Sequence, residues 1–398
     1  MNQRLDWLKH KGASPPLLGI ALLIIPLSLM CFSSASRAQE AYLVTYGPGH
    51  EVWELFGHNA IWIVDESQGI DHSFSFGYFD LGRPGFYRDF ARGIMPYYGS
   101  AGRSEREFAF YRERDRDIRV QQLNLSPPQV VELYNSLHQA IFPQPQYYDY
   151  DYYLANCSTR LRDLLDKVTD GALTEQWKNH PATRNFRDHT RALTAHRYFM
   201  HTGIQTLLGP MIDQEITLWQ EVFLPQRLAD GLADVQLGQG ALVLDDQIIY
   251  QSKTVGNRFD TVSTWRISLV LGLASLAVLL LPVFLRRRRL ARWIEQAMIG
   301  IVGLSGLVIA LMWLGSGHEA TWRNAMLLVL NPLWLLWFWP LGKRLRLGLW
   351  IVLLISGLIG VVYLALPLGQ YRFDALLWYA PLIGGLLWQT LPALEKQV

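Results

Sequence analysis

The sequence contains only two cysteines in 398 residues, and its formal net charge is only +2. Two cysteines cannot support a disulfide-stabilised mini-protein, and a composition that is 50% hydrophobic excludes a disordered or collagen-like chain. The small net charge conceals three segments of different charge. Residues 1–38 hold four basic and one acidic side chain, residues 39–264 hold 20 and 29, and residues 265–398 hold 12 and 4. We therefore expect three parts of the chain in three different environments.

Residues 1–38 have the pattern of a secretory signal peptide. Basic residues precede an apolar run over 17–32, and small residues such as Ser36 and Ala38 follow it. An uncleaved signal anchor is the alternative, and both interpretations export residues 39–264. Cys31 lies in the apolar run and would be removed by cleavage.

The last third of the chain contains five apolar stretches, each close to the roughly 20 residues that span a bilayer. They are 265–285, 294–315, 322–341, 347–368 and 374–391. Most basic residues of this third lie after the first and the third stretch, so the positive-inside rule places those two loops in the cytoplasm. We predict a five-helix transmembrane bundle over 265–398. It has no pair of buried charges typical of a pump or channel.

The exported segment begins with strands and continues with helices, which predicts an α+β domain. Runs at 42–46, 60–64, 70–76 and 118–125 favour strands, and the turn at 65–69 makes the second and third a hairpin. Two prolines at 127–128 then start a helix over 129–141 with one apolar stripe.

A second helix is predicted to begin at Cys157. Asn156 is a good N-cap, and Leu161, Leu164 and Val168 follow Cys157 at helical spacing, which places the thiol on the inward face. A helix N-terminus lowers the pKa of a thiol, and its free amides can donate to a developing oxyanion. Cys157 is therefore a candidate nucleophile, and an inert buried thiol is the alternative.

A cysteine nucleophile needs a base, which is usually histidine. His58 is the best candidate because it follows Gly57 at the start of a predicted strand, from which its side chain can project towards a facing helix. A hydrogen-bonded core histidine is the alternative. His189, His196 and His201 match no compact metal-ligand motif, and no metal site is expected.

A third group should orient the imidazole ring. The predicted hairpin places His72, Ser73 and Ser75 on the strand beside His58. A shift of one residue in register would reverse which of them shares the face of His58. His72 is the first choice, and the sequence leaves the other two open.

The order of these residues carries a resemblance. A histidine on an early strand, followed about a hundred residues later by Asn-Cys at a helix start, resembles the permuted NlpC-type papain-like fold, an order that lecithin–retinol acyltransferases share. More specifically, Trp-Glu-Leu-Phe-Gly-His-Asn-Ala at 53–60, Phe-Gly-Tyr-Phe-Asp at 76–80 and Asn-Cys-Ser-Thr-Arg at 156–160 resemble the Lnb family of bacterial lipoprotein N-acyltransferases. Phe-Leu-Pro at 223–225 and the five-span tail are also similar. One departure is that the Asn-like residue of the family near Ser75 is absent.

This resemblance implies a reaction and a location. Cys157 would be the nucleophile and His58 its base, while amides around Asn156 and Ser158, with Tyr153 or Tyr152, would hold the oxyanion. The acyl donor would be a phospholipid and the acceptor a diacylglyceryl-cysteine lipoprotein, at the periplasmic face of the bacterial inner membrane. No cofactor and no nucleic acid partner are implied.

Two other functions remain open from the sequence. A membrane-anchored cysteine amidase or peptidase acting on peptidoglycan would use the same two residues on the same fold, although five membrane helices are a large anchor for such an enzyme. A non-catalytic membrane receptor or assembly factor is the other alternative.

Overall fold

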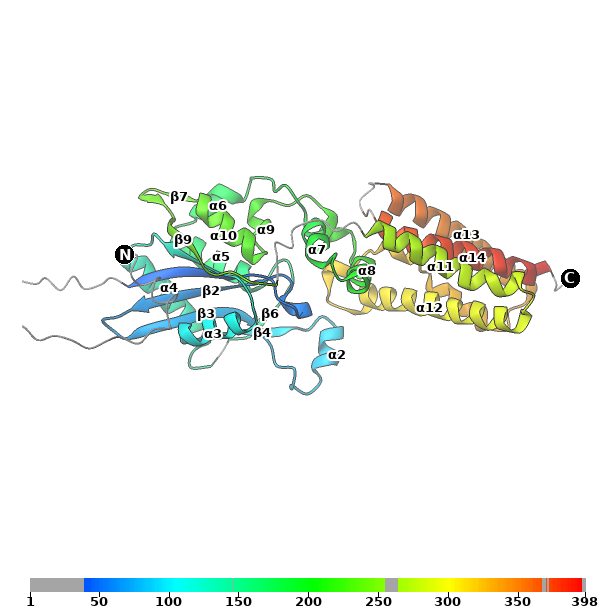
Figure 1. Ribbon diagram of the computed structural model, residues 1–398, viewed down its shortest axis with the longest axis horizontal. Helices are drawn as coiled ribbons and strands as arrows, with labels where there is room; N and C mark the ends of the chain where they lie inside the picture. The colour runs from blue at the N-terminus through cyan, green and yellow to red at the C-terminus, as the bar shows by residue number, and fades with distance from the viewer. Residues whose placement is uncertain (1–38, 145, 255–263, 367–369, 371, 396–398) are drawn as a thin grey trace, which may run out of the picture. The chain divides into compact units, whose positions relative to one another are not determined.

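The computed structural model describes residues 39–144, 146–254, 264–366, 370 and 372–395 (Figure 1). The predicted signal segment lies outside the described residues. The chain forms two compact units, which we call the sheet unit and the membrane unit. The sheet unit contains the described parts of Met1–Phe79, Pro96–His180 and Leu218–Gly256, and the membrane unit contains those of Asp80–Met95, Pro181–Thr217 and Asn257–Val398. Packing therefore divides the chain differently from the hydropathy boundary after residue 264.

The sheet unit is built on a seven-stranded antiparallel sheet with the strand order β6-β4-β3-β2-β1-β5-β9. Its strands are β1 (Glu40–Tyr46), β2 (His58–Asp65), β3 (Ile70–Tyr78), β4 (Pro96–Gly102), β5 (Ile118–Leu123), β6 (Tyr148–Asp149) and β9 (Val243–Tyr250). A separate small hairpin pairs β7 (Gln236–Leu237) with β8 (Gly240–Ala241). The four predicted strands correspond to β1, β2, β3 and β5, so these predictions are confirmed.

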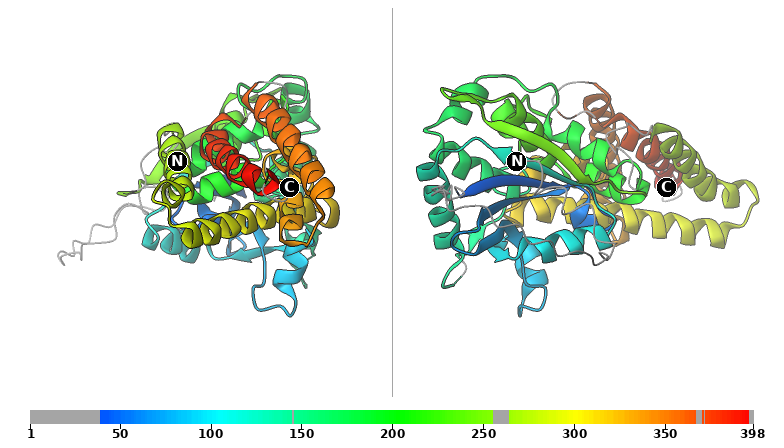
Figure 2. Two further views of the ribbon diagram at one scale, coloured as in Figure 1. Left: turned by 90° about the vertical axis from the view of Figure 1, so that its right-hand side faces the viewer. Right: turned by 60° about the vertical axis from the view of Figure 1, so that its left-hand side comes forward.

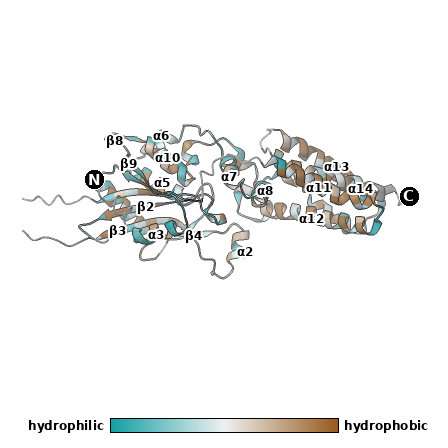
Figure 3. Cartoon of the chain, in the orientation of Figure 1, coloured by the Kyte–Doolittle hydropathy of each residue, from teal (hydrophilic) through white to brown (hydrophobic). Residues whose placement is uncertain are grey.

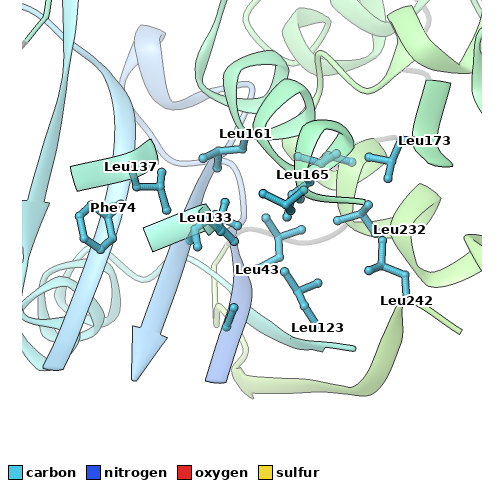
Figure 4. Packing of buried hydrophobic residues seen from close by; sticks show 14 of the residues in the cluster. Leu43, Phe74, Leu123, Leu133, Leu137, Leu161, Leu165, Leu173, Leu232 and Leu242 are labelled. Atoms are coloured by element: carbon cyan, nitrogen blue, oxygen red, sulfur yellow. The ribbon is translucent and has the colours of Figure 1, made fainter. Parts of the chain in front are cut away.

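Alternating side chains give this sheet two apolar faces. On one face, Leu43, Ile61 and Phe74 pack against the helices that Figure 4 shows around Leu133 and Leu161. These helices are α4 (Pro127–Ile141), α5 (Cys157–Val168), α6 (Ala172–Trp177) and α10 (Pro225–Asp234). The other face packs against α3 (Ser104–Glu113). Figure 2 shows the blue strands between the green helices and the cyan α3. Two short elements complete the unit, η1 (Val52–Glu54) and α9 (Leu218–Glu221).

The start of α5 agrees with the sequence prediction. The Asn156 side chain accepts a hydrogen bond from the Thr159 N–H at 3.1 Å, and the Thr159 hydroxyl accepts one from the Asn156 N–H at 2.8 Å. This reciprocal cap satisfies two backbone donors that the first helical turn leaves free. Cys157 is therefore the first residue of α5, and the fully buried Leu161 fixes the helix against the sheet.

Three helices of the membrane unit are long and apolar enough to cross a membrane: α11 (Trp265–Phe284), α12 (Arg288–Gly315) and α13 (Lys343–Ala365). A fourth long helix, α14 (Phe373–Glu395), packs along α11. Figure 3 shows that hydrophobic residues dominate all four. The prediction of an α+β domain followed by a helical membrane region is confirmed.

The third predicted stretch, 322–341, differs from the prediction because it is not a regular α-helix. After η3 (Glu319–Thr321) it contains the 3-10 helices η4 (Ala325–Leu328) and η5 (Pro332–Phe338). Asn324 and Asn331 cap these two helices, and Pro332 has no N–H with which to continue a helix from the preceding turn. The chain therefore restarts twice within an apolar run.

This segment nevertheless runs beside α12 in the opposite direction. Gly306 of α12 lies against the backbone of Leu330, and Gly303 lies against Leu335. A side chain at Gly306 would collide with the Leu330 carbonyl, so the close approach requires glycine there. Because a 3-10 helix rises about 2 Å per residue, compared with 1.5 Å for an α-helix, it covers a given depth with fewer residues.

Two segments from the exported part belong to the membrane unit. The first, 80–95, contains α2 (Phe86–Ala91), and the Arg92 carbonyl accepts a hydrogen bond from the Gly317 N–H at 2.7 Å. The second contains α7 (Phe186–Thr194), α8 (Tyr198–Leu207) and η2 (Pro210–Asp213).

A buried ion cluster joins the second segment to the start of α14. Arg187 of α7 contacts the Asp213 carboxylate at 2.6 Å, and Arg372, just before α14, contacts it at 3.1 Å. Both guanidinium groups are almost completely buried. Asp213 is thus the carboxylate that offsets two buried positive charges.

We expect Asp213→Ala to destabilise the protein by about 3–5 kcal/mol, because it leaves two buried cations without their carboxylate. Thermal unfolding of the full chain in detergent measures the effect. Glu215→Ala, an exposed neighbour, is the control and should change the midpoint little. Equal midpoints for the two variants would contradict this role of Asp213.

Candidate functional site

The thiol of Cys157 is surrounded by backbone donors. Cys157 is a free, half-buried cysteine, and the N–H groups of Asn59, Ser158 and Cys157 itself are directed at its sulfur. Burial raises the pKa of this thiol above its ordinary value, and the N–H groups oppose that shift by favouring the thiolate. The same donors are suited to hold the negative oxygen of a tetrahedral intermediate.

Asn59 holds the start of α5 on the sheet. Its completely buried side chain accepts a hydrogen bond from the Ser158 hydroxyl at 2.8 Å. It also donates to the Thr45 hydroxyl at 2.8 Å and to the Pro225 carbonyl at 3.4 Å. One amide group therefore links β1, β2, α5 and the start of α10 immediately beside the thiol.

A glycine with a positive φ lies close to Cys157 on the neighbouring strand. Gly77 of β3 has a φ of +100°, and a Cβ at this position would lie 3.8 Å from Cys157 Cβ and 3.9 Å from Tyr150 Cε2. Other residues rarely adopt this backbone conformation. The backbone conformation therefore favours glycine at this position of the motif at 76–80, next to Cys157.

His58 begins β2 and lies among three tyrosines. Its ring centroid is 6.4 Å from that of Tyr46, 6.3 Å from that of Tyr111 and 6.5 Å from that of Tyr78. Burial, followed by the positive charge of Arg116, lowers the pKa of His58 to about 3. The imidazole is therefore neutral near pH 7.

Cys157 and His58 interact with several of the same groups, in the case of Cys157 electrostatically. A thiolate at Cys157 acts electrostatically on Tyr78, Tyr111 and Arg116, and each of these groups also contacts His58 or shifts its pKa. His58 also directly precedes Asn59, whose N–H is directed at the sulfur. Within the described residues, no hydrogen bond joins the His58 ring to the Cys157 thiol.

Arg116 supplies a buried positive charge to this region. It donates to the Gly47 carbonyl at 2.8 Å and lies 3.6 Å from the Glu54 carboxylate. Its guanidinium carbon lies 4.7 Å from the centre of the Tyr111 ring. A fixed cation at this position favours negative charge that develops on sulfur or oxygen.

The structure does not bring His72 to His58. His72 pairs with Ile63 and lies on the face of β3 that carries Phe74, whose ring centroid is 6.0 Å from that of His72. Ser75 pairs with Ala60 and therefore shares the face of His58. Its hydroxyl lies 3.0 Å from that of Tyr78, so Ser75 reaches the histidine through this tyrosine.

The residues predicted to hold an oxyanion have different positions. Ser158 and Asn156 both lie beside Cys157, but the Asn156 side chain caps α5 and donates to the Phe223 carbonyl at 2.9 Å. Tyr153 is buried against Phe223, with ring centroids 5.3 Å apart. A thiolate at Cys157 instead raises the pKa values of Tyr148 and Tyr150, as it does those of Tyr78 and Tyr111.

Sequence reasoning missed the roles of Asn59 and Arg116. Asn59 belongs to the motif at 53–60 and directly follows His58, which could have drawn attention to it. Arg116 has no comparable signal, because it is one of many charged residues between 103 and 119. In the described part of the chain, no group of three or more His, Cys, Asp or Glu side chains could hold a metal ion.

We expect Ser158→Ala to lower the stability of the sheet unit by about 1–3 kcal/mol, because the buried Asn59 oxygen loses its hydrogen-bond donor. Unfolding of the full chain followed by circular dichroism measures this. Ser136→Ala, in the middle of α4, is the matched control and should stay within about 0.5 kcal/mol of the original protein. A stability loss no larger than that of the control would contradict the linking role of Asn59.

The pKa directions also predict how Cys157 reacts with an alkylating agent. The rate of modification by iodoacetamide should rise about tenfold per pH unit from pH 6 to 9, because the neutral thiol loses its proton only above its ordinary pKa near 8.5. Mass spectrometry of the Cys157 peptide from the full chain measures the rate. A rate that is constant between about pH 4 and 8 would indicate a preformed thiolate–imidazolium pair and contradict this prediction.

Comparisons with known proteins match two successive parts of the chain. The model of the Lnb N-terminal periplasmic domain matches residues 32–194, and that of the Lnb transmembrane domain matches residues 264–377. No curated protein and no solved structure matches the chain. The two family models together cover more than two thirds of the sequence and include His58, Cys157 and the three long apolar helices. This chain therefore belongs to the Lnb family and is a membrane protein with a periplasmic domain.

Proposed function

We propose that this protein is a lipoprotein N-acyltransferase in which Cys157 is the nucleophile and His58 the base. The observation that carries the proposal is the set of three backbone N–H groups directed at the Cys157 sulfur, one of them from Asn59, which directly follows the neutral His58, in a chain of the Lnb family. This set of groups suits acyl transfer, in which a sulfur attacks a carbonyl carbon and an oxyanion forms next to it.

In the first half of the reaction, the acyl chain moves from lipid to enzyme. His58 accepts the thiol proton while the Cys157 sulfur attacks the ester carbonyl of a phospholipid. The S–C bond forms, the ester C–O bond breaks, and His58 returns the proton to the departing oxygen. The products are a thioester on Cys157 and a lysophospholipid.

In the second half, the acyl chain moves from enzyme to lipoprotein. The α-amino group of a diacylglyceryl-cysteine attacks the thioester carbonyl, and His58 accepts a proton from the nitrogen. The N–C bond forms, the C–S bond breaks, and the proton returns to the sulfur. The N–H groups of Asn59 and Ser158 would hold the oxyanion in both halves, with Arg116 as the nearby positive charge.

The membrane unit would supply proximity rather than chemistry. Both substrates carry acyl chains, so both are confined to the bilayer. We infer that the protein lies in the bacterial inner membrane as a multi-pass protein, with the basic loops after the first and third apolar stretches in the cytoplasm. The ester and the amine would then meet the thiol at the periplasmic face.

Replacement of the two reacting groups should separate their roles. Cys157→Ala should abolish the acyl-thioester, while His58→Ala should lower its rate of formation by roughly 10²–10⁴-fold, the usual contribution of a general base. Full-length protein supplied with phospholipid, quenched in acid and analysed by mass spectrometry at the Cys157 peptide, measures both effects.

His72→Ala is the matched control, because His72 is a histidine of the adjacent strand on the opposite face of the sheet. It should retain the rate of the original protein. Absence of a thioester on the original protein, together with cleavage of peptidoglycan fragments, would overturn acyl transfer in favour of an amidase. Unchanged cellular function of both Cys157→Ala and His58→Ala would overturn every enzymatic function.

A further inference from the structure

The membrane unit contains a cavity of about 270 Å³ that no step of the proposed reaction uses. Side chains from the segment before α7, from α7 and from α8 line it, together with Thr264. The charged groups at its wall are Arg184, Asp188 and Arg191. A volume slightly below the roughly 300 Å³ at which small-molecule sites begin admits a compact polar group but not an acyl chain.

The cavity lies where α11 begins. Thr264 directly precedes α11, and its hydroxyl donates to Asp374 in the first turn of α14. Arg191 of the cavity wall contacts the same carboxylate at 3.2 Å. Because the exported part of the chain precedes α11, this end of the helix is periplasmic, and the cavity lies at the depth where a span leaves the hydrocarbon core.

The charges of the cavity have both signs. Among the residues that the structure describes, the side chains of Arg184 and Asp188 have no ion-pair partner, whereas Arg191 is paired with Asp374. His201 adds no charge near pH 7, since burial and the neighbouring Arg191 lower its pKa to about 4. A ligand that carries one anionic and one cationic group would offset both Arg184 and Asp188.

Aromatic side chains surround the same end of α11. Trp378 of α14 lies 6.1 Å from Tyr198 and 6.3 Å from Phe199 between ring centroids, and Phe199 is 71% exposed. The Tyr198 hydroxyl lies 2.7 Å from that of Ser268 in the first turn of α11. Tryptophan and tyrosine are enriched at the headgroup layer of membranes. These aromatic residues therefore independently support a position of the cavity at the membrane surface.

We propose that this cavity binds the headgroup of a zwitterionic phospholipid, with its phosphate at Arg184 and Arg191 and its ammonium at Asp188. Guanidinium groups bind phosphate oxygens through paired, charge-assisted hydrogen bonds, and a carboxylate accepts from a primary ammonium. The acyl chains would leave the cavity past Phe199 and run along α11. Use of the bound lipid as acyl donor rests on the proposed function, whereas binding itself does not.

Lipid binding to the full chain in detergent tests this site. Dihexanoyl phosphatidylethanolamine, dihexanoyl phosphatidylglycerol and inorganic phosphate are titrated separately, and native mass spectrometry measures bound ligand. We expect phosphatidylethanolamine to bind most tightly and inorganic phosphate to bind at least tenfold more weakly. Inorganic phosphate that binds as tightly as the lipid would overturn the proposal in favour of a free-phosphate site.

Three variants locate the binding. Arg184→Gln should weaken phosphatidylethanolamine about tenfold, as expected for a lost charge-assisted contact. Asp188→Asn should weaken phosphatidylethanolamine severalfold and leave phosphatidylglycerol unchanged, because only the former carries an ammonium. Arg266→Gln is the matched control, an exposed arginine in the first turn of α11 that does not line the cavity, and should bind as the original protein does.

Equal loss in Arg184→Gln and Arg266→Gln would overturn the proposal, because it would indicate diffuse attraction of lipids to basic residues. Arg184→Lys, which keeps the positive charge, should retain most of the affinity and guards against a folding defect in the glutamine variant. If the protein binds lipid in this cavity but forms no thioester, the proposed acyltransferase function is contradicted and the lipid site is not. If the protein forms the thioester and all variants bind lipid equally, the proposed lipid site in this cavity is contradicted and the acyltransferase function is not.

Discussion

The arrangement around Cys157 depends on the buried amide of Asn59. Its side chain contacts Thr45 on β1, Ser158 on α5 and the Pro225 carbonyl at the start of α10, and its own N–H is directed at the sulfur. A buried amide that lost these partners would be destabilising, so the four elements meet in one arrangement only. The position of the thiol therefore follows from strand pairing in the sheet rather than from an exposed loop.

Local signals were strong enough to predict much of the fold. Asn156 and the apolar positions after Cys157 predicted the start of α5, and the turn at 65–69 between two β-prone runs predicted the hairpin. The side of the sheet on which His72 lies could not be predicted, because a shift of one residue in the pairing of the two strands reverses it. Hydropathy could not distinguish the 3-10 helices within 322–341 from a regular α-helix, since both are apolar. The contacts of Arg116 join segments far apart in the sequence, and no local pattern encodes them.

Burial shifts the pKa values of Cys157 and His58 in opposite directions, and both shifts favour the neutral form. It raises the pKa of Cys157 and lowers that of His58, so both groups are neutral near pH 7. In the proposed reaction, charge would appear only as sulfur attacks the carbonyl, and the N–H groups directed at the sulfur and the positive charge of Arg116 would favour that charge. A site of this kind holds little negative charge at rest, which limits attack by oxidants on its only thiol.

Residues 80–95 and 181–217 belong to the membrane unit, so the exported part of the chain cannot be separated cleanly from the membrane helices. A soluble fragment that ended at residue 264 would keep Arg187 and Asp213 but lose Arg372. It would also lose Asn324, whose side chain donates to the carbonyls of Thr206 and Leu207 at 2.8 and 2.9 Å. Such a fragment would expose severed polar contacts and apolar surface, and it would tend to aggregate even though its seven-stranded sheet were complete. The hydrophobic boundary of this protein is not its boundary of independent folding.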